Sequence, residues 1–286
     1  MTKLDKRIGF IGGGNMGEAM VNGLIKSSLC EPEAIWVSDV REARLRFLKE
    51  NYGIHTTTEN EAVFDQVDII ILAVKPQQMD EVLEGLASGF PRSIKGVKLV
   101  ISIAAGIPIK SIEKHLYEPL DDTTKGLLPI VRVMPNTPAL VLAGMAAMSG
   151  NQYVKERDMS HARLILEAIG KVIEVEEADL DAVTAVSGSG PAYICYVIES
   201  IVEAGSGLGL RPSHALQLTL EMIKGSVQLV EETGEAAASL RKKVTSKGGT
   251  TEAAFKVLDG KNVKETFISA VQAAARRSRE LAKELG

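Results

Sequence analysis

Cysteine and histidine are scarce in this chain. Only 2 of its 286 residues are cysteine and 4 are histidine. Cys30 and Cys195 stand far apart in the sequence, without a Cys-x-x-Cys spacing and without a nearby histidine. This pattern argues against a disulfide framework and against a zinc site. Because the histidines are equally scattered, we predict no metal centre.

Long hydrophobic runs and clusters of basic residues are also missing. The longest apolar stretch, residues 139–148, is about half as long as a membrane-spanning helix, and the N-terminus carries no targeting pattern. The 33 basic and 37 acidic residues give a net charge of −4. We therefore expect a cytoplasmic protein that binds neither membrane nor nucleic acid.

The remaining composition is that of a folded protein. Hydrophobic residues make up 45% of the chain and charged residues 24%, which is too apolar for a disordered protein. At about 150 residues per domain, the length allows one large domain or two domains of ordinary size.

The first half of the chain alternates short β-branched runs with helical stretches. Residues 68–74 read Asp-Ile-Ile-Ile-Leu-Ala-Val, which is apolar on both faces of a strand and typical of a covered parallel sheet. The alternation predicts a doubly wound, mostly parallel α/β domain of the Rossmann type over residues 1–176. The predicted strands are 8–11, 35–38, 69–74, 99–103, 131–134 and 172–175, and the predicted helices are 16–26, 42–50, 77–87 and 155–169.

The second half, residues 177–286, is predicted to be all helical. Glycine and proline separate five helical segments. The segment 215–230 is apolar around most of its circumference, and about 110 residues of helix offer little core to bury it. This favours a subunit interface around a two-fold axis, although a central helix of a monomeric bundle remains an alternative. The predicted helices are 191–208, 212–232, 235–244, 251–258 and 263–285.

A glycine-rich sequence follows the first predicted strand. Gly12, Gly14 and Gly17 fit the pattern Gly-x-Gly-x-x-Gly directly before a helix. The first glycine permits a tight turn, the second lets a pyrophosphate approach the backbone, and the third lets the helix pack on the sheet. Asp39 follows Gly17 by 22 positions, at the end of the second strand, where an acidic residue contacts the ribose. We predict a dinucleotide site rather than a plain glycine-rich turn.

The nature of the dinucleotide is left open by the neighbours of Asp39. The Asp39 carboxylate suits the ribose diol of NAD, whereas Ser38 and Arg41 suit the additional phosphate of NADP.

Five motifs, in this order, resemble those of pyrroline-5-carboxylate reductases over essentially the whole chain. They are Ala-Val-Lys-Pro at 73–76, Ala-Ala-Gly at 104–106, Met-Pro-Asn-Thr-Pro at 134–138, Ser-Gly-Ser-Gly-Pro-Ala-Tyr at 187–193 and Val-Thr-Ser-Lys-Gly-Gly-Thr-Thr at 244–251. The last resembles the family signature Val-Thr-Ser-Pro-Gly-Gly-Thr-Thr, with Lys247 in place of proline. Lys243 stands where the family has an uncharged or acidic residue near the nicotinamide.

The predicted cofactor site combines the glycine loop with positions that the resemblance implies. Ala73, Val74, Lys75 and Ala105 are implied on the nicotinamide side, and Asn60 and Ser38 on the adenosine side. Topology favours the same positions, because ligands bind at the carboxyl ends of the strands. A solvated loop lysine is the alternative for Lys75. The full predicted set is Ile11, Gly12, Gly14, Asn15, Met16, Gly17, Ser38, Asp39, Arg41, Asn60, Ala73, Val74, Lys75, Pro76, Ala104 and Ala105.

Residues 246–251 are the predicted substrate loop. Gly248 and Gly249 leave backbone N–H groups open at the start of a helix, which suits a carboxylate. Ser246 and Thr250 add donors, and the resemblance implies that the Thr251 hydroxyl bonds the substrate ring nitrogen, so Thr251 is the predicted catalytic residue. The alternative is that Thr250 and Thr251 only cap the helix.

Ser189 and Glu177 complete the predicted substrate site. The resemblance implies that residues 187–191 form a tight passage beside the active site and that Glu177 lies near the substrate amine. The alternatives are a helix break with proline in the first turn and a solvated acidic turn.

The resemblance implies reduction of 1-pyrroline-5-carboxylate to L-proline, the last step of proline biosynthesis, with NADP(H) favoured and NAD(H) as the alternative. It also implies a homodimer as the building block of a larger oligomer, such as a decamer. Two alternatives are a related imine reductase or 3-hydroxyacid dehydrogenase-like oxidoreductase, and a non-enzymatic NADP-binding protein. Against the dehydrogenase, residues 205–209 offer no lysine where its chemistry needs one.

Overall fold

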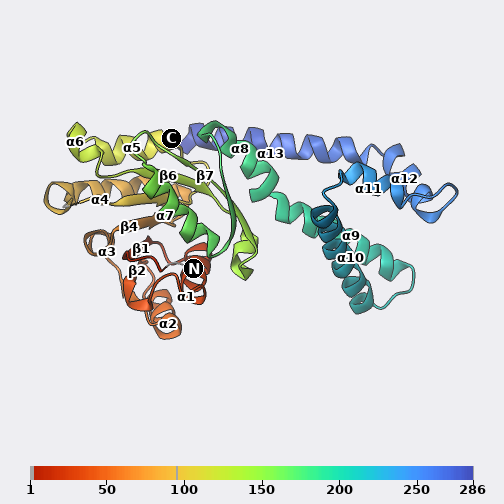
Figure 1. Ribbon diagram of the computed structural model, residues 1–286, viewed down its shortest axis with the longest axis horizontal. Coiled ribbons are helices and arrows are strands. Elements are labelled where there is room, and N and C mark those ends of the chain that lie inside the picture. Colours follow the sequence, from red (N-terminus) through yellow and green to blue (C-terminus); the bar gives the residue numbers. More distant parts are fainter. Residues whose placement is uncertain (1–2, 95, 286) are drawn as a thin grey trace. The chain divides into compact units, whose positions relative to one another are not determined.

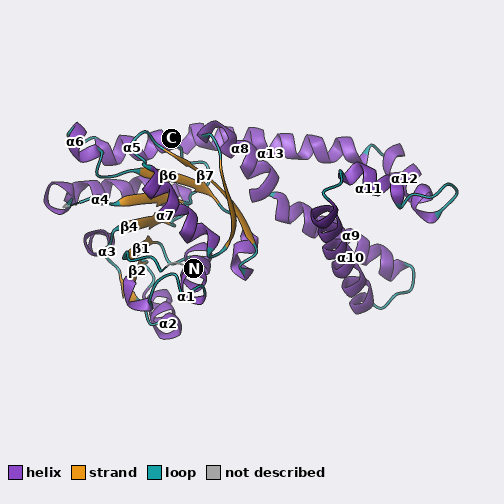
Figure 2. Ribbon diagram, in the orientation of Figure 1, coloured by secondary structure: helices purple, strands orange, loops and turns teal. Residues whose placement is uncertain are grey.

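The computed structural model describes residues 3–94 and 96–285, with the side chains of 90–93 and 285 left out (Figure 1). The chain divides into two compact units: residues 1–189 with 274–286 form the first, and residues 190–273 form the second. The first unit holds the strands and the second is built from helices (Figure 2). The domain boundary after residue 176 remains a prediction.

The first unit is built on an eight-stranded sheet. Its strand order is β3-β2-β1-β4-β5-β6-β7-β8, and only the β6–β7 pair is antiparallel. The order reverses direction between β1 and β4, which places the ligand crevice of such a sheet at the end of β1. The strands are β1 Ile8–Ile11, β2 Ile35–Ser38, β3 His55–Thr57, β4 Ile69–Leu72, β5 Leu99–Ser102, β6 Ile130–Met134, β7 Gly144–Gly150 and β8 Gly170–Glu174.

Helices cover both faces of this sheet, and each face has its own hydrophobic core. One core joins the sheet to buried residues such as Leu24 of α1 and Ile165 of α7. The other core joins it to Leu83 of α4 and Ile112 of α5. The helices are α1 Asn15–Lys26, α2 Glu42–Tyr52, α3 Asn60–Gln66, α4 Met79–Ser93, α5 Ile109–Tyr117, α6 Asp122–Lys125, α7 Glu156–Glu167 and α8 Leu180–Val183, with short 3-10 turns at Pro32–Ala34, Pro76–Gln78, Thr137–Val141 and Glu177–Asp179 and a π-helical turn at Thr184–Gly188.

The predicted doubly wound fold is confirmed, with two strands added to it. All six predicted strands are present, although the predicted runs to 74 and 103 end earlier, at Leu72 and Ser102. The sequence did not indicate β3, which has three residues, or β7, which reads Gly-Met-Ala-Ala-Met-Ser-Gly. Both lack β-branched apolar runs, so only pairing with a neighbouring strand makes them strands.

The second unit consists of helices α9 Gly190–Gly207, α10 Pro212–Thr233, α11 Ala237–Lys243, α12 Thr250–Gly260 and the first part of α13 Val263–Leu285. These five helices match the predicted segments to within two residues. Helix α13 begins in the second unit, and its last turns, from Ala274 onward, belong to the first. No described helix is long and apolar enough to cross a membrane.

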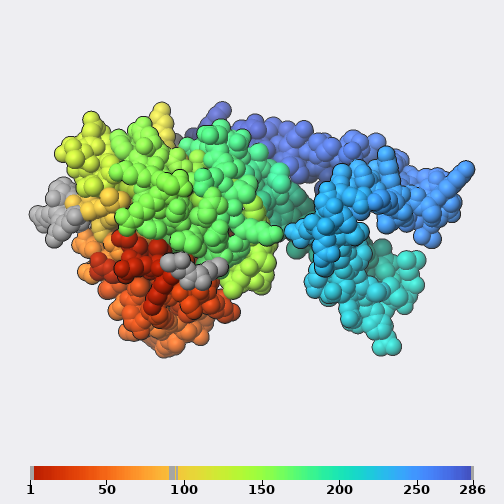
Figure 3. Space-filling model, in the orientation of Figure 1, coloured from red at the N-terminus to blue at the C-terminus, as the bar shows by residue number. Residues whose placement is uncertain are grey.

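Apolar side chains of α10 remain exposed in the isolated chain. Only Ala215 and Thr219 of this helix are buried. Leu218 is 60% exposed and Val227 54% exposed, and Leu216, Met222, Leu229 and Val230 are exposed as well. Figure 3 shows the surface of this unit in teal to blue. A monomeric bundle would bury these side chains, so the described residues do not support the bundle alternative.

Candidate functional site

The glycine-rich loop lies at the carboxyl end of β1 and leads into α1. Gly12 has a φ of +103°, and a Cβ at this position would lie 2.7 Å from the Ala73 carbonyl oxygen. A Cβ at Gly17 would lie 2.7 Å from the Gly12 carbonyl oxygen. Both positions therefore require glycine. Gly14 is the N-cap of α1 and has open space around it, which leaves the helix N-terminus accessible to an anion.

The Asp39 carboxylate is fixed beside this loop. Its Oδ2 accepts a hydrogen bond from the Gly13 N–H at 3.0 Å, and the Arg41 guanidinium binds both carboxylate oxygens at 2.8 and 2.9 Å. Burial alone would raise the pKa of Asp39, but the hydrogen bonds from Arg41 and Gly13 outweigh it and lower the pKa. Asp39 is therefore an ionised acceptor whose charge Arg41 neutralises, and the Arg41 side chain remains 62% exposed.

Ser38 and Asn60 contact each other at the end of β2. The Ser38 hydroxyl donates to Asn60 Oδ1 at 2.7 Å and approaches the Phe10 carbonyl oxygen at 3.4 Å. Ser38 is fully buried. Its hydroxyl is occupied in this arrangement, so of the two residues suggested for an additional phosphate, only Arg41 is exposed.

A side-chain network behind the loop was not indicated by the sequence. Arg44 donates to the carbonyl oxygens of Gly13 and Gly14 and forms an ion pair with Glu18. Tyr52 donates to the same carboxylate at 2.9 Å. These contacts join α1, α2 and the loop, and hold the glycine-rich backbone in place. Three glycines mark the loop in a sequence, whereas a distant arginine that binds their carbonyl groups leaves no local signal.

The predicted nicotinamide-side residues follow neighbouring strands. Ala73 and Val74 come directly after β4 and are half-buried, while Lys75 is exposed. Ala104, which is buried, and Ala105, which is exposed, follow β5. Because β4 and β5 are parallel neighbours, these segments lie at the same edge of the sheet as the glycine loop.

Glu177 has two partners within the first unit. Its Oε1 accepts a hydrogen bond from the Ile109 N–H at 2.7 Å and one from Arg132 Nη1 at 3.0 Å. Glu177 thus ties the start of α5 to β6. The Arg132 side chain is only 9% exposed, so the Glu177 carboxylate is the partner that compensates its buried positive charge. The sequence indicated Glu177 but neither partner, since they lie 68 and 45 residues away.

The motifs at 134–138 and 187–191 are connected through Asn136. Its side-chain nitrogen donates to the Ser187 hydroxyl at 3.2 Å, and its oxygen accepts from the Met145 N–H at 2.9 Å. Ser189 directly follows the π-helical turn Thr184–Gly188, and its N–H is bonded to the Thr184 carbonyl oxygen. Turns of this type are frequent at functional sites, which fits the predicted tight passage.

The predicted substrate loop lies in the second unit, at the start of α12. Gly249 is the N-cap residue, and no side chain caps this helix. Neither threonine hydroxyl therefore acts as the cap. Glu252 Oε2 accepts a hydrogen bond from the Gly248 N–H at 2.7 Å, which shows that this backbone group receives a carboxylate. Thr251 is half-buried, and Ser246 and Thr250 are exposed.

The two unusual lysines near this loop lie in different surroundings. Lys243 forms an ion pair with Glu235 at 2.6 Å, so its charge is neutralised locally. Lys247 is exposed.

The first unit therefore brings together, at one edge of the sheet, the glycine loop, Asp39, Arg41 and the segments after β4 and β5. Together the fold and this edge define a Rossmann-type dinucleotide-binding protein joined to a helical unit. Two family models match the chain: pyrroline-5-carboxylate reductase dimerisation over residues 177–281, and NADP oxidoreductase, coenzyme F420-dependent, over residues 7–106. Curated relatives match nearly its whole length.

The pyrroline-5-carboxylate reductase of Synechocystis is 40% identical over 97% of this chain and 99% of its own length. That of Escherichia coli is 35% identical over 98% of this chain and 100% of its own. The chain belongs to the pyrroline-5-carboxylate reductase family.

Solved structures agree with this assignment. A pyrroline-5-carboxylate reductase from Coxiella burnetii has a TM-score of 0.85 and 39% identity, and covers 97% of this chain and 99% of its own. The Plasmodium falciparum pyrroline carboxylate reductase with NADP bound has a TM-score of 0.86 and 30% identity, and covers 98% of this chain and 100% of its own.

Proposed function

We propose that this protein reduces the C=N bond of 1-pyrroline-5-carboxylate to give L-proline, using a nicotinamide dinucleotide. The observation that carries the proposal is the family membership over the full length, together with the intact glycine loop and the intact Gly-Gly-Thr-Thr sequence at 248–251. A related imine reductase, a hydroxyacid dehydrogenase and a non-enzymatic protein are disfavoured, because the matched relatives share the whole chain and not the dinucleotide-binding part alone.

The residues of the first unit suit a dinucleotide. The open N-terminus of α1 at Gly14 offers N–H groups and a positive helix end to the pyrophosphate, with Asn15 and Met16 as the first residues of that helix. Ile11 directly precedes the glycine loop, and Pro76 directly follows Lys75 in the segment after β4. Asp39 and Arg41 lie where the adenosine ribose is expected. The bound reduced nicotinamide supplies the hydride.

The residues of the second unit suit a small cyclic imine with one carboxylate. The first N–H groups of α12 have no acceptor within their own helix, so they can bind the substrate carboxylate. The hydrogen bond from the Gly248 N–H to the Glu252 carboxylate is an example of such a contact. Ser246 and Thr250 add donors at the same end of the helix, and the Thr251 hydroxyl orients the ring nitrogen.

The proton on the product nitrogen needs no strong acid. A cyclic imine is basic enough to bind partly protonated, and a threonine hydroxyl is a weak acid. Thr251 therefore orients the nitrogen and relays a proton, with water as its source. Ser189 supports the substrate site, whereas Glu177 acts by holding Arg132 and the start of α5 and approaches the substrate amine from there.

NADP(H) is the proposed cofactor, with NAD(H) as the alternative. The proposal rests on Arg41, an exposed guanidinium that neutralises Asp39 and so reduces the repulsion between this carboxylate and a phosphate. The relative from Plasmodium falciparum is described with NADP bound.

A homodimer is the proposed building block of the assembly, extending to a decamer. The dimerisation model covers residues 177–281, and α10 exposes apolar side chains that a second subunit would bury. The proposed location is the cytoplasm, in keeping with a biosynthetic reaction on small polar molecules.

Turnover with the purified protein tests the proposed reaction. NADPH oxidation should depend on added 1-pyrroline-5-carboxylate and yield L-proline in equal amount. 3-Hydroxyacids with NADP+ should give no reduction of the cofactor. Turnover of the hydroxyacids, or binding of NADPH without any turnover of the imine, would contradict the proposal.

A further inference from the structure

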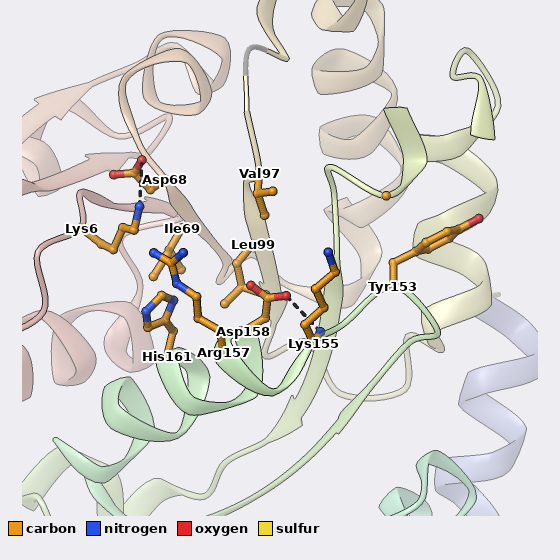
Figure 4. A pocket seen from close by; sticks show the side chains of 11 residues that line it. Lys6, Asp68, Ile69, Val97, Leu99, Tyr153, Lys155, Arg157, Asp158 and His161 are labelled. Carbon is orange, nitrogen blue, oxygen red and sulfur yellow. Dashed lines mark hydrogen bonds and ion pairs between the residues drawn. The ribbon is translucent and has the colours of Figure 1, made fainter. Parts of the chain in front are cut away.

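A second cavity lies in the first unit, away from the dinucleotide edge. Its volume is about 190 Å³. Its lining residues come from the segments before β1, β4 and β5, from the first positions of β4 and β5, from Gly126 after α6, and from Tyr153, Lys155 and the start of α7 (Figure 4). The cavity therefore opens at the amino ends of the parallel strands, whereas the glycine loop lies at their carboxyl ends. The two sites are at opposite edges of one sheet.

Positive side chains from two parts of the fold meet in this cavity. Figure 4 shows the Arg157 and His161 side chains next to each other and Lys6 nearby, with the Lys6 amine directed at Asp68 and the Lys155 amine on the other side of the cavity. Among the described residues, no carboxylate lies within ion-pair distance of Arg157 or of the Lys155 amine, and the His161 ring has no hydrogen-bond partner.

The two carboxylates of the cavity are already engaged. Asp158 Oδ2 accepts a hydrogen bond from the Lys155 backbone N–H at 3.0 Å and so closes the first turn of α7. Asp68 Oδ2 accepts from the Arg7 N–H at 3.0 Å, and its Oδ1 lies 3.7 Å from Lys6 Nζ. Neither carboxylate neutralises Arg157. The cavity thus holds more positive than negative charge.

The pKa of His161 is lowered in this surrounding. Burial lowers the pKa of its imidazole, and the charges of Arg157 and Lys6 lower it further, against the opposing effect of Asp158. Like charges that lower a histidine pKa are held close together at a cost in free energy. An anion bound among them would remove that cost.

We propose that this cavity is a second binding site, which takes a small phosphate-bearing dianion beside Arg157 and His161, with Lys6 and Lys155 as the further positive groups of its lining. A tetrahedral phosphate accepts hydrogen bonds in several directions, and an arginine binds two of its oxygens at once. A monocarboxylate offers a single negative charge and two oxygens in one plane, so it matches a cavity with several positive groups less well. The source is free phosphate or a phosphomonoester of similar size.

The His161 imidazole is the reporter for the test. Its titration is followed by NMR in the full-length protein, with the resonance assigned through His161→Asn. Inorganic phosphate and, separately, glycerol phosphate are added at constant ionic strength with chloride as the balance. Each ligand that binds should raise the His161 pKa by about half a unit or more, because the added negative charge favours the imidazolium. The ligand that acts at lower concentration identifies the source.

Variants of positive residues inside and outside the cavity show whether the anion binds in this cavity. Arg157→Gln should raise the apparent Kd for the anion at least about tenfold, as expected for one charge-assisted contact. Lys155→Gln should weaken binding in the same direction. Arg46→Gln, which removes an exposed arginine of α2, should leave the Kd unchanged. The proposal is wrong if neither ligand moves the His161 pKa, or if the shift survives unchanged in Arg157→Gln.

Discussion

Single residues at the two predicted ligand sites have partners that set their chemistry. Asp39 is neutralised by Arg41 and bonded to the Gly13 N–H, so the carboxylate proposed to bind the ribose and the cation proposed to bind the phosphate form one unit. At α12, Glu252 occupies the Gly248 N–H, and Gly249 rather than a threonine is the N-cap. These pairings determine what each substitution should change.

Arg41→Ala should weaken the binding of NADPH more than the binding of NADH. A charge-assisted contact to a phosphate contributes about 1.5–3 kcal/mol, so the KM for NADPH should rise at least about tenfold. The Asp39 carboxylate, freed of its cation, adds repulsion in the same direction. Initial rates with both cofactors measure this, with Arg46→Ala as the control. Equal losses for NADPH and NADH would overturn the NADP assignment.

Thr251→Val should lower kcat about 10- to 100-fold, because it removes one hydroxyl from the transition state and preserves the shape of the side chain. The thermal unfolding temperature should stay the same, since Gly249 and not Thr251 is the N-cap of α12. Thr251→Ala leaves more space, and water that enters it should restore part of the rate. If both variants turn over at the parent rate, Thr251 has no part in the reaction.

Cys30 should contribute to stability below about pH 9 and lose this contribution at higher pH. Burial raises the pKa of its thiol from 9.0 to about 11, so the folded state holds the proton more tightly than the unfolded chain does. The free energy of unfolding should therefore fall by up to about 2 kcal/mol between pH 9 and 11. Chemical denaturation across this range measures the fall.

Two alanine variants identify the thiol responsible. Cys30→Ala should flatten the pH dependence, whereas Cys195→Ala, at an exposed position, should keep it. The same slope in all three proteins would show that Cys30 does not account for it.

At the scale of elements, polar side chains join segments that packing alone would leave independent. Glu177 connects α5 to β6 through Ile109 and Arg132, and Asn136 connects the turn after β6 to the π-helical turn before α9. Glu177, a residue of the proposed substrate site, therefore also holds elements of the first unit together.

Glu177→Gln should lower the free energy of unfolding by about 1–2 kcal/mol. The substitution leaves the Arg132 charge without a partner, and the loss stays moderate because the Glu177 side chain is 35% exposed to water. Urea denaturation of Glu177→Gln, Arg132→Met and the double variant measures the coupling between the two side chains. Additive losses would mean that the pair contributes nothing. A rise in KM for the imine in Glu177→Gln that Arg132→Met does not share would indicate direct substrate contact.

At the scale of the whole molecule, the second unit contains more apolar surface than one chain can bury. Its helix α10 buries only Ala215 and Thr219, while most of its large apolar side chains stay exposed. The sequence pattern and the exposure of these side chains both indicate that a second subunit covers them.

Val227→Glu should dissociate the oligomer and abolish turnover together. Val227 is 54% exposed in the single chain, so a charge at this position leaves the subunit fold intact and disrupts only the contact between subunits. Leu218→Glu, at a side chain that is 60% exposed, should act in the same way. Light scattering measures the mass and circular dichroism confirms the fold, with Lys49→Glu on α2 as the control. A monomeric parent protein would refute the prediction.

Local patterns in the sequence were sufficient for most of the architecture. Apolar runs of two-sided strands, helical periodicity and the glycine pattern are properties of consecutive residues, so they predicted the Rossmann-type sheet, the five terminal helices and the loop at Gly12. The strand β7 escaped prediction because alanine, methionine and glycine have little preference for strands, and its pairing with β6 and β8 decides its conformation.

By itself, the sequence determined which backbone segments become strands, helices and glycine turns, and it located the motifs that carry the proposed reaction. Only the tertiary structure decided which side chains are engaged. The ties of Arg44 to the Gly13 carbonyl, of Glu177 to Arg132 and of Asn136 to Ser187 span 31, 45 and 51 residues. The cavity at the amino ends of the strands likewise combines Lys6 with Arg157 and His161, which are far from it in the sequence. Such contacts depend on how separate elements pack, and no periodicity or local spacing encodes that arrangement.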